Sequence, residues 1–273
     1  MYSPFFGGPM LEIRNLTKIY DDGTEALKNV SFKVEDGEFL VIIGLSGSGK
    51  STLLRCINRL IEPTEGEILW NGKDVAKADG RSLREVRRQI GMIFQHFNLV
   101  KRSSVMTNVL AGRLGYVKPT SSLLHHFPQS DRKKAFEAME MVGITNQAEK
   151  RADELSGGQQ QRVGIARALM QDPLMILADE PVASLDPVLA HSILGYLEDI
   201  NKKRDITIMC SLHYLDLVQQ YSSRVIGLRD GNLVYEGSNA DIRKMTDGEF
   251  KEIYGEEAVR VNAGSITGGG ENE

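Results

Sequence analysis

A glycine-rich segment between two apolar stretches carries residue types that bind phosphate. Its residues, in order, are Gly44, Leu45, Ser46, Gly47, Ser48, Gly49, Lys50, Ser51 and Thr52. The first eight fit the pattern G-x-x-x-x-G-K-[ST], in which glycines let the backbone curl so that successive N–H groups face phosphate oxygens. We expect Lys50 to reach the terminal phosphates and the Ser51 hydroxyl to bind Mg²⁺. A glycine-rich turn without a ligand is the alternative.

The elements on either side of this segment favour a phosphate site. The apolar run Phe39–Ile43 predicts a buried strand, and Ser51–Ile57 predicts the opening of a helix. A helix N-terminus adds positive partial charge to the loop before it, which stabilises a bound phosphate. The sequence therefore predicts that Gly44–Thr52 binds the phosphates of a nucleotide.

Two adjacent carboxylates follow a second apolar run. Leu174–Ala178 predicts a parallel strand buried on both faces, and Asp179 and Glu180 come directly after it. Ligands of open α/β sheets bind at the C-terminal edge of the strands, where these carboxylates would lie. We expect Asp179 to hold Mg²⁺ through water, and Glu180 to orient or deprotonate an attacking water. A solvated pair of loop carboxylates is the alternative.

A third segment is typical of an anion site, and it consists of Leu155, Ser156, Gly157, Gly158 and Gln159. Ser156 and the two glycines precede an expected helix over Gln159–Gln171, so that backbone N–H groups and the helix dipole would face a phosphate. An ordinary N-capped helix is the alternative. With this segment the chain resembles the ATP-binding cassette family, whose signature it matches, and the resemblance runs from about Leu11 to Tyr254.

The resemblance implies a shared site between two copies of the chain. In the family, each ATP is held by the phosphate loop of one subunit and the signature of the other, in a head-to-tail homodimer. The loop that crosses this interface corresponds to Ser184, Leu185 and Asp186, and the Asp186-Pro187 pair should also cap the next helix.

Further roles follow from the same resemblance. Tyr20 matches the aromatic residue that stacks on adenine, and His213 matches the histidine at the γ-phosphate, although either could be an ordinary residue of a strand or strand end. Gln95 matches the glutamine that contacts Mg²⁺ and water and senses the transport partner. The expected catalytic residues are thus Glu180, His213 and Gln95, and the expected Mg²⁺ ligands, partly through water, are Ser51, Gln95 and Asp179.

Composition limits the class of protein. The chain has 273 residues, of which 41% are hydrophobic, and its apolar runs are far shorter than the ~20 residues that a membrane span needs. A net charge of −4 argues against a nucleic-acid partner. No signal-peptide pattern opens the chain. We therefore expect a cytosolic chain with any membrane partner on another chain, and with Cys56 and Cys210 buried and reduced. The family resemblance implies a peripheral protein on the cytoplasmic face of the inner membrane.

The pattern of strands and helices predicts an α/β fold with a P-loop core of mostly parallel sheet. Strands over Leu11–Tyr20, Leu27–Val34 and Glu67–Trp70 predict an N-terminal antiparallel β subdomain, with a turn at Asn71-Gly72. An α-helical subdomain is expected as an insertion at about 96–155, with a surface loop at 117–129. Residues 1–10 are expected to be an irregular extension, and residues 255–273 a disordered tail. The adjacent His125 and His126 lack further metal ligands nearby.

One cassette without fused membrane helices or long coiled coils resembles the ATPase of a bacterial importer. Three stretches, Arg88–Val100, Leu110–Gly115 and Ala178–Pro187, resemble the phosphonate import ATP-binding proteins. This implies that ATP hydrolysis drives uptake of phosphonate, phosphite or a phosphate ester through a separate permease, with an extracytoplasmic solute-binding protein as an indirect partner. A polar amino-acid or methionine importer is the alternative, and a non-transport cassette ATPase is less favoured. Phe97 and Leu99 are expected to form the permease-docking surface, unless they pack internally.

Overall fold

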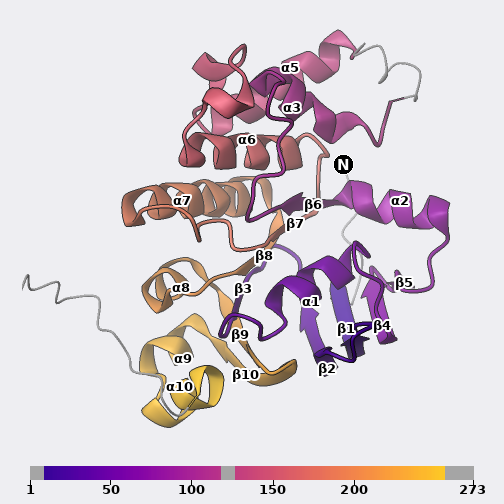
Figure 1. Ribbon diagram of the computed structural model, residues 1–273, viewed down its shortest axis with the longest axis vertical. Coiled ribbons are helices and arrows are strands. Elements are labelled where there is room, and N and C mark those ends of the chain that lie inside the picture. The colour runs from indigo at the N-terminus through magenta and orange to yellow at the C-terminus, as the bar shows by residue number, and fades with distance from the viewer. Residues whose placement is uncertain (1–8, 118–126, 256–273) are drawn as a thin grey trace, which may run out of the picture.

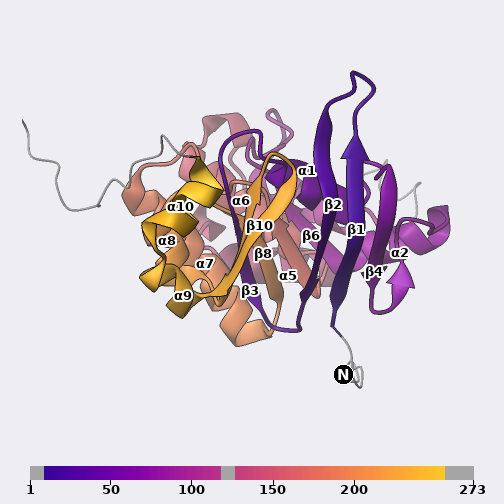
Figure 2. The ribbon, with the colours of Figure 1, turned by 90° about the horizontal axis from the view of Figure 1, so that it is seen from below.

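The structure is a computed structural model that describes residues 9–117 and 127–255. Within these residues the chain forms two sheets with helices around them (Figure 1). The antiparallel sheet has the order β2-β1-β4-β5 and consists of β1 (Leu11–Ile19), β2 (Glu25–Val34), β4 (Glu65–Trp70) and β5 (Lys73–Asp74). Figure 2 shows β2, β1 and β4 side by side at one end of the molecule. The expected N-terminal antiparallel strands are therefore confirmed.

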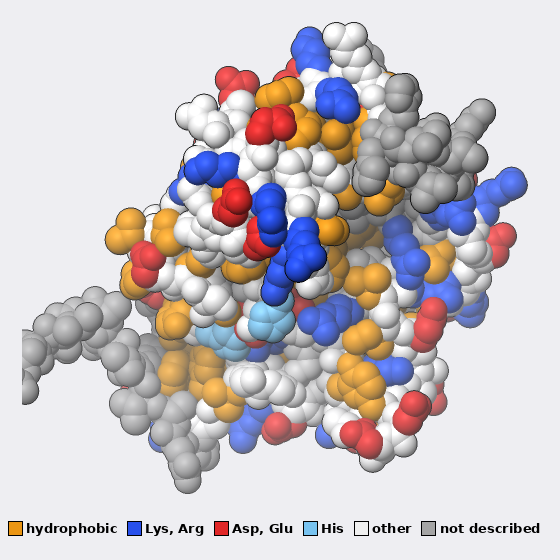
Figure 3. All heavy atoms as spheres, turned by 45° about the horizontal axis from the view of Figure 1, so that its top comes forward, with side chains coloured by type: hydrophobic (Ala, Val, Ile, Leu, Met, Phe, Trp, Pro, Cys, Tyr) orange, Lys and Arg blue, Asp and Glu red, His pale blue; other side chains and the backbone are white. Residues whose placement is uncertain are grey.

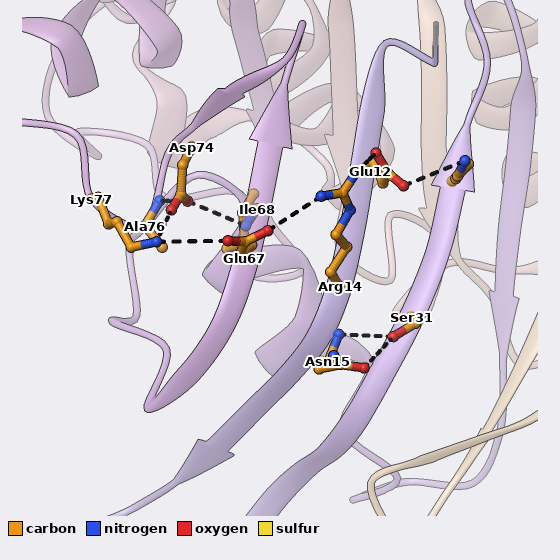
Figure 4. Close-up of polar contacts among 10 residues, drawn as sticks. Glu12, Arg14, Asn15, Ser31, Glu67, Ile68, Asp74, Ala76 and Lys77 are labelled. Carbon is orange, nitrogen blue, oxygen red and sulfur yellow. Dashed lines mark hydrogen bonds and ion pairs between the residues drawn. The ribbon is translucent and has the colours of Figure 1, made fainter.

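Charged side chains link the strands of the antiparallel sheet on its exposed face (Figure 4). Arg14 on β1 donates to Glu12 Oε2 at 2.8 Å and lies 3.5 Å from Glu67 Oε2 on β4. The Arg14 guanidinium is the main cause of a lowered pKa at the Glu12 carboxyl. At the end of β4, Asn71 and Gly72 both have positive φ, 47° and 76°, as a tight hairpin turn requires.

The second sheet has six strands in the order β10-β9-β3-β8-β7-β6 within the described residues. Its members are β3 (Phe39–Ile43), β6 (Ile90–Ile93), β7 (Met175–Ala178), β8 (Thr207–Ser211), β9 (Arg224–Arg229) and β10 (Asn232–Ser238). The pairs from β9 to β6 are parallel, and only β10 joins antiparallel, after a turn at Asp230-Gly231. This is the mostly parallel core that the sequence predicts.

The parallel strands are buried on both faces. On β3, Val41 and Ile43 belong to the hydrophobic cluster on one face of the sheet, whereas Leu40 and Ile42 belong to the cluster on the other. Since successive side chains of a strand point to opposite faces, an unbroken apolar run needs cover on both sides. One face is covered by α1 (Lys50–Ile57) and the antiparallel sheet, and the other by helices that include α7 (Pro187–Arg204) and α8 (Leu215–Tyr221).

The helices lie around both sheets, and one group of them packs together at one end of the molecule. At one end are α3 (Val105–Leu110), α5 (Gln129–Met141) and α6 (Gly157–Leu169), with the 3₁₀ turns η1 (Ala111–Arg113), η2 (Thr145–Gln147) and η3 (Ala152–Glu154). The others are α2 (Gly80–Gln89), α7 (Pro187–Arg204), α8 (Leu215–Tyr221), α9 (Asn239–Lys244) and α10 (Asp247–Tyr254). Figure 1 shows α3, α5 and α6 packed together, far from α9 and α10.

Both cysteines of the chain lie in the hydrophobic core. Cys56 and Cys210 are free and buried, as expected, and burial raises the pKa of the Cys56 thiol to about 12 and raises that of Cys210 as well. The extension at residues 1–8, most of the 117–129 segment with His125 and His126, and the tail beyond residue 255 lie outside the described residues.

Candidate functional site

Four neighbouring strands deliver the predicted site residues to one edge of the sheet. The strand β3 leads into the glycine loop, β7 into Asp179 and Glu180, β6 into Gln95, and β8 into His213. These strands are adjacent in the order β3-β8-β7-β6 and run parallel. Segments far apart in sequence therefore meet at the C-terminal edge of the sheet, where ligands of such folds bind.

A cavity of ≈ 580 Å³ lies at this edge. Its lining residues are Tyr20, Thr24, Glu25, Ala26, Lys28, Ser46, Gly47, Gly49, Lys50, Ser51, Thr52, Gln95, Glu180 and Asp230. The predicted Tyr20 and Gln95 thus join the glycine loop and Glu180 in one cavity. The contributions of Thr24, of the start of β2 and of Asp230 were not predicted, because these segments carry no motif and reach the cavity only through the fold. One backbone contact that brings them there is Lys28 N–H to Gly231 O, at 2.8 Å.

The glycine loop has a conformation that its glycines make possible. Gly44 has φ 143° and Gly49 has φ 105°. A Cβ at Gly44 would lie 2.2 Å from Leu228 O, and one at Gly49 would lie 2.4 Å from Ala26 O. Both positions therefore need glycine for their dihedral angles and for the close approach of neighbouring backbone.

The Lys50 side chain folds back into the glycine loop that precedes it. Its side chain is 3% exposed, and its Nζ donates to Gly44 O at 2.9 Å and to Leu45 O at 2.8 Å. Burial lowers the pKa of the ammonium, and the nearby Glu180 and Asp179 carboxylates act in the opposite direction. A fixed positive charge therefore faces the place where the loop would hold phosphate.

Asp179 joins the carboxylate strand to the helix of the glycine loop. The residue is fully buried, its Oδ1 accepts from Ser51 Oγ at 2.7 Å, and its Oδ2 accepts from Arg55 Nη2 at 2.9 Å. Sequence reasoning missed Arg55, although its place one helical turn after Ser51 puts both on the same face of α1. The Ser51 hydroxyl, the Asp179 carboxylate and the Gln95 amide of the same cavity are hard oxygen donors, so this site fits Mg²⁺.

Glu180 is held by contacts on both its backbone and its side chain. It has a left-handed φ of 46°, and its N–H donates to Ser211 Oγ at 2.8 Å. Its Oε1 lies 2.6 Å from His213 Nε2 and 4.0 Å from Lys50 Nζ. A strained backbone fixed by such contacts is typical of functional positions. The structure therefore brings Glu180, His213 and Lys50 together as the sequence predicts.

The signature segment does not line this cavity. The helix α6 begins at Gly157, two residues before the predicted start, so the prediction that both glycines precede the helix is wrong. Ser156 is the N-cap, because its Oγ accepts from Gln159 N–H at 3.4 Å and Gln159 Oε1 accepts from Ser156 N–H at 3.0 Å. This reciprocal capping box fixes the start of the helix.

The predicted dimer loop lies against the signature segment of the same chain. A Cβ at Gly157 would lie 3.6 Å from Leu185 Cδ2. Asp186 caps α7, as predicted, by accepting from Leu189 N–H at 3.0 Å. Ser184 is exposed, and so is Val188 in the first turn of α7, at 79%. On the face drawn in Figure 3, histidine side chains lie beside Lys and Arg side chains near the middle of the molecule.

The apolar residues on either side of Gln95 differ in their packing. Phe94 packs against the hydrophobic cluster on the antiparallel-sheet side, and Leu99 packs against the other cluster, so Leu99 is mainly an internal contact. Val100 is 63% exposed. A second cavity of ≈ 340 Å³ lies beside this segment, and its lining residues are Arg55, Leu60, Ile61, Phe94, Gln95, His96 and Asn98.

Comparison with known proteins identifies the family. Residues 27–183 match the sequence model of the family described as "ABC transporter". The chain is a member of the ABC transporter family. It is 48% identical to "Phosphonates import ATP-binding protein PhnC 3" of Halalkalibacterium halodurans, over 97% of this chain and 100% of that protein. It is 54% identical to "Phosphonates import ATP-binding protein PhnC" of Staphylococcus aureus (strain USA300), over 90% of this chain and 94% of that protein.

Solved structures of ABC cassettes have the same fold. The ATP-binding cassette MJ0796, described as a dimer in a post-hydrolysis state bound to ADP and Pi, aligns with a TM-score of 0.74 and 35% identity over 84% of this chain and 99% of that chain. The ADP conformation of the cassette MJ1267 aligns with a TM-score of 0.78 and 30% identity over 90% and 98%. The predicted α/β fold is confirmed. Among the residues that the structure describes, no helix is long and apolar enough to span a membrane.

The buried Asp179 predicts how the chain should respond to loss of Arg55. Arg55→Gln should lower the free energy of unfolding by about 1–3 kcal/mol without nucleotide, because it leaves a buried carboxylate with one partner fewer, the loss being limited by the 40% exposure of Arg55. Added MgATP should reduce the difference from wild type. Urea unfolding with and without MgATP measures both effects. Arg14→Gln, in an exposed network, is the matched control, and equal losses in the two variants would contradict the prediction.

Proposed function

We propose that the chain is the ATP-hydrolysing subunit of an importer that takes up phosphonate or a related oxyanion through a separate permease. The observation that carries this proposal is the position of the Glu180 carboxylate, held between His213 and Lys50 beside a glycine loop of the P-loop type. The relatives named as phosphonate import ATP-binding proteins support the choice of solute.

Each group of site residues has a separate role in ATP hydrolysis. Backbone N–H groups of the glycine loop and the Lys50 ammonium bind the phosphates, and Tyr20, which lines the same cavity, stacks on adenine. Ser51, Asp179 and Gln95 would hold Mg²⁺, partly through water, and the ion would neutralise charge on the phosphates. Glu180 accepts a proton from the attacking water, while the hydrogen bond from His213 fixes the orientation of the carboxylate.

The position of the signature supports a dimer. Ser156 and its helix start lie outside the cavity of their own chain, and the neighbouring dimer loop is exposed, so both are free to face the nucleotide of a second copy. The helix dipole of α6 favours an anion at this end, and its first turn carries no acidic residue. Two head-to-tail copies would thus enclose two ATP molecules, as the dimeric cassette MJ0796 suggests.

The proposed contact with the permease lies beside Gln95. The cavity lined by Leu60, Phe94 and Gln95 lies between the core and the segment that leads to α3, and Leu60 is 50% exposed. A short helix of a membrane subunit seated there would sense the nucleotide through Gln95. The chain would then be a peripheral protein on the cytoplasmic face of the inner membrane, with a solute-binding protein acting on the opposite side.

Transport by the assembled system tests the proposed function. Vesicles that contain this chain with its permease and solute-binding protein should accumulate labelled phosphonate only when MgATP is supplied on the side of this chain. Uptake of methionine or a polar amino acid in place of phosphonate would favour that importer class. ATP turnover without uptake of any of these solutes would contradict the importer assignment.

Replacement of the proposed base separates binding from turnover. Glu180→Gln should lower kcat for ATP by about 100-fold or more, because the water loses its proton acceptor, while the loop and Lys50 still bind nucleotide. Phosphate release and calorimetric ATP binding give the two measurements. Glu137→Gln, an exposed residue of α5, is the control. Phosphate release near the wild-type rate in Glu180→Gln would show that another group is the base.

Blocking the signature tests the head-to-tail dimer. In the Glu180→Gln background, Ser156→Arg should leave ATP binding to the monomer intact but prevent MgATP-induced dimerisation, because a bulky side chain would fill the site of the partner's phosphate. Light scattering with and without MgATP measures the dimer. Ser130→Arg, at an exposed serine in the first turn of α5, is the matched control. Dimerisation of the Ser156→Arg variant on MgATP would rule out this arrangement.

A further inference from the structure

The loop directly after Gln95 has a strained backbone. Phe97 and Asn98 both adopt left-handed conformations, with φ values of 57° and 47°. Side-chain-bearing residues rarely adopt such angles, and two in succession persist only where surrounding contacts hold them. These two residues connect a side chain of the nucleotide cavity to the helices that follow, so whatever holds them also affects Gln95.

The contact that holds this loop comes from α6. Arg167 donates from Nη1 to Asn98 O at 2.5 Å and from Nη2 to Phe97 O at 2.8 Å. Two nitrogens of one planar guanidinium thus serve two successive carbonyls in a rigid fork, which the single nitrogen of a flexible lysine side chain does not present. The Arg167 side chain is partly buried, and this burial lowers the pKa of the guanidinium. Arg167 therefore links α6, the helix of the signature segment, to the loop after Gln95.

Close packing against η1 also holds α6 at the turn that carries Arg167. A Cβ at Gly112 in η1 would lie 2.2 Å from Arg167 O and 2.8 Å from Met170 Cβ, so the backbone of η1 lies directly against this turn of α6. At the other end of α6, a Cβ at Gly157 would lie 3.8 Å from the Phe97 ring. The loop is thus attached to α6 near its start through the Phe97 ring and near its end through Arg167.

From these contacts we infer that Arg167 is a positioning residue for Gln95, and that it transmits displacement between the nucleotide cavity and the signature helix. The inference rests on the proposed role of Gln95 in ATP hydrolysis. Arg167 is not among the residues that line the nucleotide cavity. It acts by fixing the two carbonyls that follow Gln95, so that the amide enters the cavity in one orientation and the loop moves together with α6.

The first experiment removes the rigid two-nitrogen fork but keeps the positive charge. Arg167→Lys in the full-length chain should lower kcat for MgATP by about tenfold, because a misplaced group near reacting atoms reduces turnover more than binding. The KM for ATP should stay within about threefold, because the phosphate loop and Lys50 are unchanged. Arg162→Lys, on the same helix with its guanidinium over the Tyr196 ring, is the matched control and should keep kcat within about twofold.

A double-mutant cycle distinguishes positioning from a general loss of structure. If Arg167 acts through Gln95, Arg167→Lys should lower kcat in the wild-type background but cause no further loss in the Gln95→Ala background. Thermal unfolding of every variant serves as the check on folding.

Each other outcome counts against the inference. Equal fold-losses in both backgrounds, or a rise in KM without a fall in kcat, would show that Arg167 does not act through Gln95. An unchanged kcat in Arg167→Lys would overturn the inference while leaving the proposed function intact. A wild-type chain that does not hydrolyse ATP would overturn the proposed function, and this inference with it.

Discussion

The buried carboxylate of Asp179 is the contact on which the site depends. It ends one strand of the parallel sheet, yet both of its oxygens are bonded to α1, the helix that begins at the glycine loop. A fully buried carboxylate is stable only where such partners meet it, so the register of β7 and the position of α1 must agree. The adjacent Glu180 and the phosphate loop are placed by that agreement, since each is covalently continuous with one of the two elements.

A second set of contacts links this core to the helices around α6. The core depends on apolar strands buried on both faces, which leave little freedom for movement. The helices α3, α5 and α6 are attached to it partly through the short loop after Gln95, whose backbone conformation is unfavourable without outside contacts. The loop after Gln95 is therefore a direct link between the nucleotide site and these helices.

Sequence reasoning predicted the elements whose signals are local. Apolar runs located the parallel strands, the P-loop pattern located the cavity, and Asp186-Pro187 located a helix start. The features that sequence reasoning did not predict have a common physical cause. The carbonyls held by Arg167, the cavity contribution of Asp230 and the internal packing of Leu99 all depend on how distant segments meet, which no local pattern encodes. At the signature, Ser156 began the helix earlier than predicted because its capping box with Gln159 includes both glycines in the first turn.

The burial of the two thiols has a practical consequence for measurement. The chain contains two cysteines, and both are enclosed among apolar side chains with raised thiol pKa values, so the reactive thiolate is scarce at neutral pH. Maleimide dyes and nitroxide labels will therefore react poorly with the native protein. A single cysteine placed on an exposed position of α5 or α7 would be labelled selectively, which makes the unaltered chain a ready background for distance spectroscopy.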